Sequence, residues 1–234
     1  MTPKIYAHRG ASGNAPENTM AAFQLALEQG ADGFELDVTL SKDGEVVVIH
    51  DDTVDRTATG KGSVRDLALT ELQSFDAGQG EHIPTLEEVL EGLGGKLWIN
   101  IELKSIMNIF NPLPIKTAQL VNACGLIDSV LISSFNPLNL IRFHRHCPSS
   151  KIALLTLPKM AKYFVGRVFS YDALHPFHSD VDQSLVERIH KDQKEINVWT
   201  ADDPEEIKRL AAIHVDGIIT NYPLRTRKIL ESGL

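Results

Sequence analysis

Short runs of hydrophobic residues alternate with segments of helical periodicity along the whole chain. The short runs predict nine strands, at Lys4–His8, Gly33–Leu40, Glu45–Ile49, Leu97–Leu103, Val130–Ser133, Ile152–Leu155, Tyr171–His175, Ile196–Trp199 and Gly217–Thr220. Hydrophobic positions at three- and four-residue spacing predict helices between most of these strands, at Asn18–Glu28, Thr85–Leu93, Ile115–Cys124, Pro137–His146, Asp182–Lys191, Asp203–Ala212 and Leu224–Ser232. Strands and helices that alternate on this scale form a parallel sheet, so we predict an α/β fold.

The third predicted strand differs from the others, because its connection to the second strand is too short for a helical crossover. This connection contains Asp43-Gly44, the strongest signal for a two-residue hairpin turn. We therefore expect the third strand to return antiparallel to the second, in a register that places His50 opposite Asp37. The remaining eight strands fit a closed (β/α)8 barrel, a single domain of residues 1–234, in which active sites lie at the C-terminal mouth.

Three acidic residues are predicted to point into this barrel. Glu35 and Asp37 are two positions apart on one strand, so their side chains share a face. The same alternation places Glu102 and Lys104 on the inward face of another strand. Buried carboxylates are costly unless they are neutralised, and ion pairs with Lys104 and Arg9 leave an excess of acid. The acids therefore favour a divalent cation with oxygen ligands, Mg²⁺, Ca²⁺ or Mn²⁺, over simple ion pairing.

Two histidines, His8 and His50, close strands at the same end of the predicted barrel. Two imidazoles beside a scissile bond can divide the work of general acid and general base. Arg9 offers a planar fork that suits a phosphate, and Lys104 offers a point charge for the same group. Gly10 is expected to let the backbone approach a ligand closely. The spacing of the two histidines does not decide which of them is the acid.

The composition excludes several classes of partner. The net charge is −8, from 23 basic and 31 acidic residues, which argues against a surface for nucleic acid. No hydrophobic run approaches the ~18 residues that a membrane span requires, and no basic-hydrophobic leader opens the chain. Cys124 and Cys147 are isolated, as expected for buried thiols in a reducing compartment. We expect a cytoplasmic protein that acts on a small molecule without stable membrane insertion, as a monomer or a homo-oligomer.

Five short motifs occur in a fixed order along the chain: His8-Arg9-Gly10, Glu17-Asn18-Thr19, Glu35-x-Asp37, His50-Asp51 and Glu102-x-Lys104. With these motifs the sequence resembles the glycerophosphodiester phosphodiesterase family, also called glycerophosphoryl diester phosphodiesterases. Later segments resemble the same family, namely Ser133-Ser134-Phe135, Trp199-Thr200 and Asp216-Gly217-Ile218-Ile219-Thr220-Asn221. The resemblance extends over essentially the whole chain.

The resemblance implies a distorted (β/α)8 TIM barrel with a small insertion after the second histidine. Residues 51–82 have the right position for this insertion and are rich in Gly, Thr and Asp. One departure lies near the C-terminus of the barrel. The family commonly continues Trp-Thr with Val-Asn, whereas this chain has Ala201-Asp202, so we expect the rim to differ there.

The resemblance also implies roles for individual side chains. It implies a metal site formed by Glu35, Asp37 and Glu102. It implies that His8 and His50 are the acid–base pair. The remaining motif residues would bind or frame the substrate: Arg9 and Lys104 at the phosphate, Trp199 at the glycerol end, and Glu17 and Asn18 as supports of the mouth.

The expected function is metal-dependent hydrolysis of glycerophosphodiesters, such as glycerophosphocholine or glycerophosphoethanolamine, to glycerol 3-phosphate and an alcohol. Such a hydrolase would belong to glycerol and lipid metabolism. The apolar segment Ile106–Ile115 leaves open an alternative, a lysophospholipase-D-like phosphodiesterase for acylated substrates. A non-catalytic phosphodiester-binding barrel is disfavoured, because both histidines and all three acids are present. An aldolase or isomerase barrel fits the paired histidines poorly.

Overall fold

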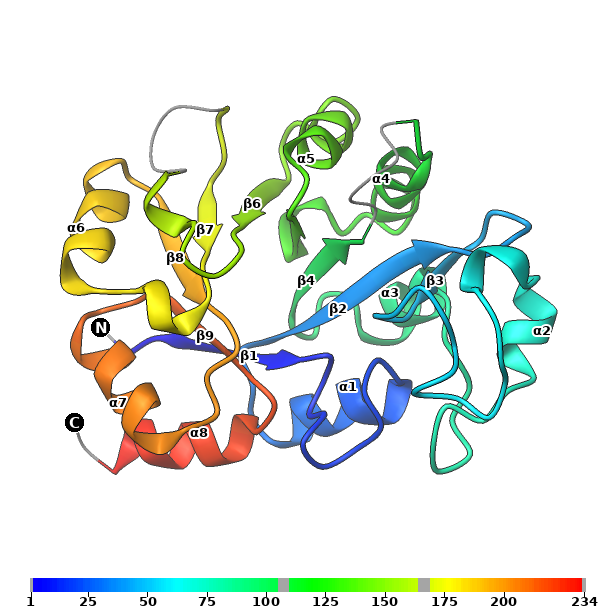
Figure 1. Cartoon of the computed structure of the whole chain (residues 1–234), viewed down its shortest axis with the longest axis horizontal. Helices are drawn as coiled ribbons and strands as arrows, with labels where there is room; N and C mark the ends of the chain where they lie inside the picture. Colours follow the sequence, from blue (N-terminus) through cyan, green and yellow to red (C-terminus); the bar gives the residue numbers. More distant parts are fainter. Residues whose placement is uncertain (1, 105–109, 164–168, 233–234) are drawn as a thin grey trace.

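A closed ring of parallel strands forms the centre of the molecule in the computed structural model, which describes residues 2–104, 110–163 and 169–232 (Figure 1). The strands are β1 (Lys4–His8), β2 (Gly33–Leu40), β3 (Val46–Val48), β4 (Trp98–Leu103), β5 (Val130–Ser134), β6 (Lys151–Leu155), β7 (Ala173–His175), β8 (Glu195–Val198) and β9 (Gly217–Thr220). They pair in the order β1-β9-β8-β7-β6-β5-β4-β2, and a pairing of β1 with β2 closes the ring. Strand β3 joins β2 antiparallel. The predicted TIM barrel with one extra return strand is confirmed.

Helices cover the outside of the ring (Figure 1). They are α1 (Met20–Glu28), α3 (Leu86–Leu93), α4 (Leu113–Ala123), α5 (Pro137–His144), α6 (Gln183–Lys191), α7 (Pro204–Ala212) and α8 (Pro223–Glu231), while α2 (Leu69–Gln73) lies in the segment that follows β3. The predicted helices are found with slightly different ends. Helix α1 begins later than predicted because the Thr19 hydroxyl caps it, accepting a hydrogen bond from the Ala22 backbone N–H. Within the described residues, the β6–β7 connection has a single 3-10 turn in place of an α-helix.

The alternation of side chains along the strands separates the hydrophobic core from the site. On β2, Phe34, Leu36 and Val38 are buried in the main hydrophobic cluster between strands and helices. Glu35 and Asp37 lie between them and point to the inside of the ring, as period-two alternation requires. A separate cluster of Leu131, Ala153 and Ala173 from three adjacent strands fills the inside toward the N-terminal ends of these strands. The polar side chains therefore gather at the C-terminal mouth.

The β2–β3 hairpin is present, but its predicted register is wrong by one residue. Val38 pairs with Val48, and Ile49, not His50, lies opposite Asp37 through a 3.0 Å hydrogen bond from its backbone N–H to the Asp37 carbonyl. The loop has three residues, 42–44, closed by a bond from the Ser41 N–H to the Glu45 carbonyl. Gly44 has φ +85°, the left-handed conformation that three-residue hairpin loops need at this position.

Gly10 is a second glycine, and its position in the fold leaves no room for a side chain. It has φ +78°, and an added Cβ would come within 2.6 Å of the Ala22 backbone and side chain at the start of α1. The absence of a side chain therefore allows a close contact with helix α1, and the expected approach to a ligand stays a prediction.

Residues 51–82 follow β3 and surround a small hydrophobic cluster of their own. The cluster contains Val54, Val64, Leu72 and Ala77 with Ile83, and Val47 and Ile49 of the hairpin complete it. This second cluster supports the proposal that residues 51–82 are a small insertion in a single barrel domain.

Hydrophobic surface that could meet a lipid would lie on the apolar segment or on a long hydrophobic helix. Residues 106–109 of the apolar segment Ile106–Ile115 lie outside the described residues, and of the remainder Phe110 is 83% exposed. Among the described helices, none combines the length and the hydrophobicity that a membrane crossing requires.

Candidate active site

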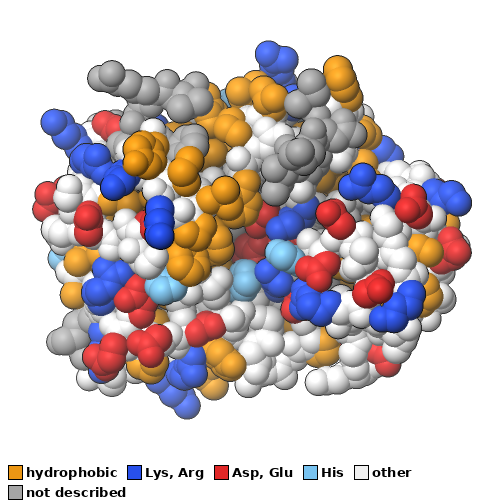
Figure 2. Space-filling view, in the orientation of Figure 1, with side chains coloured by type: hydrophobic (Ala, Val, Ile, Leu, Met, Phe, Trp, Pro, Cys, Tyr) orange, Lys and Arg blue, Asp and Glu red, His pale blue; other side chains and the backbone are white. Residues whose placement is uncertain are grey.

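A hollow opens at the centre of the face shown in Figure 2, over the C-terminal ends of the strands. Acidic side chains lie at its bottom, histidines and basic side chains on one side, and hydrophobic side chains on the other. The lining residues come from strands all around the ring and from the loops that follow them: His8, Arg9, Glu35, His50, Asn100, Glu102, Lys104, Ser133, Phe135, Leu155, Trp199 and Ile219. The pocket therefore collects most of the residues that were singled out in the sequence.

Three buried carboxylates form the acidic part of this pocket. Ligand oxygens of Glu35, Asp37 and Glu102 lie within 4.8 Å of one another. The pairing of β2 with β4 explains this proximity, because it places Glu35 beside Asn100 and Asp37 beside Glu102. The inward alternation predicted for both strands thus brings all three acids to one point.

Two basic side chains flank the acids. The Lys104 Nζ lies 2.9 Å from Glu102 Oε1 and 3.4 Å from Asp37 Oδ1. The Arg9 Nε lies 3.3 Å from Asp37 Oδ2, and the Arg9 backbone N–H donates to Glu35 Oε2 at 3.0 Å. Arg9 has φ +56°, so its backbone is held in the left-handed region at this contact.

The acids differ in how well these bases compensate them. Burial raises the pKa of Glu35 well above its usual range, and repulsion by Asp37 and Glu102 adds to the effect. Burial and repulsion by Asp37 likewise raise the pKa of Glu102 to about 7, against the attraction of Lys104. Burial acts in the same direction on Asp37, but Lys104 and Arg9 outweigh it and lower the pKa of this carboxyl. Three acids with two bases leave the cluster short of positive charge.

The donor set of this cluster fits a hard divalent cation. It offers carboxylate oxygens from three converging side chains, which is the ligand type that Mg²⁺, Ca²⁺ and Mn²⁺ prefer. The raised pKa values of Glu35 and Glu102 show that additional positive charge would stabilise the ionised cluster. The buried acids are therefore consistent with a metal site.

Asn18 holds one of the acids, and Glu17 holds the arginine beside them. The Asn18 side-chain amide donates to Asp37 Oδ2 at 2.9 Å, and its carbonyl accepts from the Asp37 backbone N–H at 3.3 Å. Glu17 accepts from Arg9 at 2.8 Å and from both terminal nitrogens of Arg56 at 2.8 Å. Neither residue lines the main pocket, and their supporting place at the mouth stays a prediction.

His50 reaches the pocket from the turn after β3 and is oriented by a carboxylate. Its Nδ1 lies 2.6 Å from Asp51 Oδ1. Arg56 in turn donates from Nε to Asp51 Oδ2 at 2.7 Å, and this pairing together with His50 lowers the pKa of Asp51. Because a carboxylate only accepts hydrogen bonds, the His50 Nδ1 carries a proton and Nε2 faces the other way.

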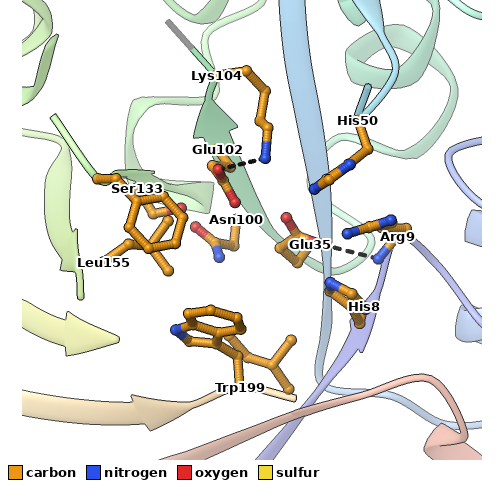
Figure 3. Close-up of a pocket in the computed structure, with 12 residues that line it drawn as sticks. His8, Arg9, Glu35, His50, Asn100, Glu102, Lys104, Ser133, Leu155 and Trp199 are labelled. Carbon is orange, nitrogen blue, oxygen red and sulfur yellow. Dashed lines mark hydrogen bonds and ion pairs between the residues drawn. The ribbon is translucent and has the colours of Figure 1, made fainter. Parts of the chain in front are cut away.

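His8 lies on the same side of the pocket as His50, with Arg9 between them, as Figure 3 shows. Its Nδ1 lies 2.8 Å from Oδ1 of Asn221, the residue that follows β9. Burial and the positive charge of Arg9 lower the pKa of His8 to about 4, so its imidazole is neutral near pH 7.

An aromatic and aliphatic wall faces the histidines. In Figure 3, Trp199 and Leu155 lie on the opposite side of the pocket from His8, Arg9 and His50. The Trp199 indole N–H donates to the His175 backbone carbonyl at 2.8 Å, which fixes the ring. Phe135 packs edge-on against Trp199 with ring centroids 5.7 Å apart. This wall is suited to the carbon atoms of a substrate, while the opposite side is suited to its charged group.

The inside of the barrel below the pocket is unusually polar. Asn100 and Ser133 line the pocket, and within the described residues Asn100 Oδ1 and Ser133 Oγ are buried without a hydrogen-bond partner. His175 is buried but does not line the pocket, and its Nε2 lies 3.1 Å from the Asn197 side-chain nitrogen. Burial lowers the pKa of His175 to about 3. His175 is therefore a histidine of the barrel interior and not part of the pocket wall.

Sequence reasoning missed several side chains that this geometry brings forward. Arg56 joins Asp51 to Glu17, and Asp202 contacts Asn221, but no motif marked either of them for a role. Phe135 and Asn221 stood in segments that resemble the family, but without an assigned place. The position of Asp51 directly after a site histidine could have indicated that it orients His50. No feature of the sequence around Arg56 indicated its contacts.

Comparisons with known proteins place the chain in a family. A model described as the glycerophosphoryl diester phosphodiesterase family matches residues 8–225. A glycerophosphodiester phosphodiesterase from Caldanaerobacter subterraneus subsp. tengcongensis is 41% identical over 243 residues, which covers 100% of each chain. A solved glycerophosphodiester phosphodiesterase structure from Agrobacterium tumefaciens is 32% identical, with a TM-score of 0.83 over 99% of this chain and 100% of that chain.

A phosphodiesterase from Oleispira antarctica, solved in complex with the product sn-glycerol-3-phosphate, is 29% identical, with a TM-score of 0.90 over 98% of this chain and 97% of that chain. The matched ranges contain both pocket histidines, the three acids and the two flanking bases. The expected class of enzyme, a phosphodiester hydrolase, is therefore confirmed. The chain belongs to the glycerophosphoryl diester phosphodiesterase family.

Proposed function

We propose that this enzyme hydrolyses deacylated glycerophosphodiesters, of the glycerophosphocholine and glycerophosphoethanolamine type, to glycerol 3-phosphate and the free alcohol. The observation that carries the proposal is the convergence of two histidines, two acids and two bases on one pocket, with the third acid, Asp37, directly beside them. A phosphodiester is a small anion that needs positive charge around its phosphate and proton transfer at its two oxygens. This pocket offers both, next to an apolar wall that can take the carbon chain.

The proposed metal ligands are Glu35, Asp37 and Glu102. A cation such as Mg²⁺, Ca²⁺ or Mn²⁺, when bound, would neutralise phosphate charge and orient the diester. Arg9 and Lys104 add preorganised positive charge on the same side, and both already contact the acids at hydrogen-bonding or ion-pair distance. Trp199 supports binding of the glycerol end through the wall that it forms with Phe135.

His8 and His50 are the proposed acid–base pair. One imidazole takes a proton from the nucleophile, which is water or the glycerol 2-hydroxyl, as the new P–O bond forms. The other gives its proton to the alcohol oxygen as the old P–O bond breaks, so the two transfers balance. With the 2-hydroxyl as nucleophile the first product is a cyclic phosphate, which water then opens to glycerol 3-phosphate with the two histidines in exchanged roles. Glu17 and Asn18 keep Arg9 and Asp37 in position for this reaction.

A direct assay tests the proposed substrate. The purified chain is incubated with glycerophosphocholine, glycerophosphoethanolamine and lysophosphatidylcholine in the presence of Mg²⁺, and glycerol 3-phosphate is measured with a coupled dehydrogenase. We expect release from the two deacylated diesters. Absence of turnover on every deacylated diester, with metal present and the protein folded, would refute the proposal.

A lysophospholipase-D-like activity is the second candidate. Exposed hydrophobic side chains favour it, because Phe110 is 83% and Leu157 is 60% exposed on loops that follow β4 and β6. An acyl chain could rest on such residues. With choline release as the readout for both substrates, this candidate predicts cleavage of lysophosphatidylcholine to lysophosphatidic acid and choline at a rate similar to or above that of glycerophosphocholine. The cytoplasmic location stays a prediction.

A further inference from the structure

The residue that departs from the family pattern, Asp202, lies next to the only described partner of the His8 ring. Asp202 Oδ2 accepts a 2.5 Å hydrogen bond from the Asn221 side-chain amide, and Oδ1 accepts from the Asn221 backbone N–H at 2.8 Å. The Thr220 hydroxyl donates to the same Oδ1 at 2.8 Å. Three donors thus converge on one carboxylate directly beneath Asn221.

These bonds decide which way the Asn221 amide faces. A carboxylate can only accept, so the amide nitrogen must point to Asp202 and the amide oxygen must point away from it. The oxygen then faces His8, where its distance to Nδ1 is 2.8 Å. An asparagine at position 202 would lack this selectivity, because its side chain carries a donor as well as an acceptor.

The amide orientation in turn decides the tautomer of His8. Because an amide oxygen accepts hydrogen bonds, Nδ1 of the neutral ring must carry the proton. The other ring nitrogen, Nε2, then has a free lone pair. A tautomer set by the partner of the second nitrogen is the arrangement by which a histidine base is held ready for proton abstraction.

We propose that Asp202 and Asn221 are positioning residues that fix His8 in the Nδ1–H tautomer and leave Nε2 to accept a proton. This inference rests on the proposed function and adds to it an assignment that the motifs left open. His8 acts as the general base toward the nucleophile. His50 is the proton donor as an imidazolium with protons on both ring nitrogens: Nδ1–H stays on the Asp51 carboxylate, and the Nε2 proton goes to the departing alcohol. The partners distinguish the two rings, because His8 meets a neutral amide whereas His50 meets a carboxylate that can pair with a cation.

Nuclear magnetic resonance tests the tautomer without reference to activity. Long-range ¹H–¹⁵N correlation spectra distinguish protonated from unprotonated ring nitrogens, and the His8→Gln spectrum identifies the His8 signals. We expect the wild-type enzyme near pH 7.5 to show a protonated Nδ1 and a free Nε2. Asn221→Leu should lose this single pattern, and Asp202→Asn should show a mixture. A wild-type His8 protonated on Nε2 would overturn the proposal.

The double variant Asp202→Asn/Asn221→Asp provides the rescue. It exchanges the amide and the carboxylate, so that the new carboxylate at position 221 accepts from His8 Nδ1 and from the new amide at position 202. We expect the Nδ1–H tautomer to return. Asp203→Asn is the matched control, because it makes the same change one residue away, at the N-cap of α7. An Asn221→Leu spectrum identical to that of the wild type would contradict the proposal.

Kinetics give a second, independent readout. Loss of a residue that orients a site histidine costs about 10–100-fold in activity, so we expect Asn221→Leu to lower kcat by that factor and Asp202→Asn by less. KM and the metal requirement should change little, because neither residue contacts the acids in the described structure. If wild-type turnover fails on every diester, the proposed function fails while the tautomer measurement stands. If turnover is normal and Asn221→Leu keeps full kcat, the positioning role fails alone.

Discussion

Replacement of Glu102 by glutamine should stabilise the metal-free protein and at the same time reduce its activity. Burial among other acids raises the pKa of this carboxyl from 4.5 to about 7 despite the 2.9 Å contact with Lys104. In metal-free protein, the ionised Glu102 therefore destabilises the fold. At pH 8 a shift of this size corresponds to roughly 3 kcal/mol, from about 1.4 kcal/mol per unit.

The pH dependence of stability at Glu102 follows from proton linkage. Between pH 4.5 and pH 7 the folded protein binds more protons at Glu102 than the unfolded chain does, so stability falls as the pH rises through this window and then stays level. The glutamine variant lacks this loss. In EDTA at pH 8 we expect Glu102→Gln to unfold at higher urea concentration than the wild type, with a gain of up to about 3 kcal/mol.

With metal bound, we expect the wild-type enzyme to be more stable than the Glu102→Gln variant. We expect Mg²⁺ to stabilise the wild-type enzyme against urea and to have much less effect on Glu102→Gln, whose turnover should be strongly reduced. Glu91→Gln on the exposed surface of α3 is the control and should change neither stability nor metal response. A Glu102→Gln variant that is markedly less stable than the wild type in EDTA would refute the reasoning.

Three further predictions follow from the same structure. Single replacement of His8 or His50 by alanine should lower kcat by about 10²–10⁴-fold while metal affinity, measured by calorimetry, stays nearly unchanged. If His50 protonates the departing alcohol, His50→Ala should regain most of its loss on a p-nitrophenyl glycerophosphodiester, whose leaving group needs no proton; an equal loss on both substrates would contradict this. His175 has its pKa lowered from 6.5 to about 3, so wild-type stability should fall by about 2 kcal/mol as the pH drops from 7.5 to 5 through this residue alone. Urea unfolding should show a smaller fall for His175→Gln and an unchanged fall for the exposed-site control His146→Gln.

The convergence of the three acids could be predicted from the sequence, because their inward orientation depends only on the alternation of side chains along a strand. Once Glu35 and Asp37 lie on one strand and Glu102 on its parallel neighbour, pairing within a closed barrel brings them together. The extra return strand was also predictable, since no crossover fits so short a connection.

The hairpin register depends on the loop length, and an Asp-Gly pair does not determine whether the loop has two residues or three. Two- and three-residue loops both accept a glycine with positive φ, and the three-residue form is stabilised here by Asp43. Its carboxylate accepts from the Ser41 hydroxyl at 2.6 Å and from the Leu69 backbone N–H at 3.1 Å, a contact with the distant α2 segment. His50 enters the pocket through the turn that follows β3, so its place was right although the register was wrong.

The partners of the histidines could not be predicted for a related reason. Asn221 meets His8 only because β9 pairs with β1 across the closure of the ring, more than two hundred positions away in the sequence. Arg56 meets Glu17 through the fold of residues 51–82, which carries little hydrophobic periodicity. Contacts of this kind depend on tertiary packing, which no local pattern records.

In the proposed mechanism, three buried acids hold a divalent cation on which hydrolysis of a glycerophosphodiester depends. The most direct test is glycerol 3-phosphate release from glycerophosphocholine by protein stripped with EDTA, before and after titration with Mg²⁺, Mn²⁺ or Ca²⁺. We predict no turnover in the stripped enzyme and recovery with at least one of these ions, with a higher metal requirement when Asp37 is replaced by asparagine. Full turnover in EDTA by protein that contains no bound metal would contradict the account.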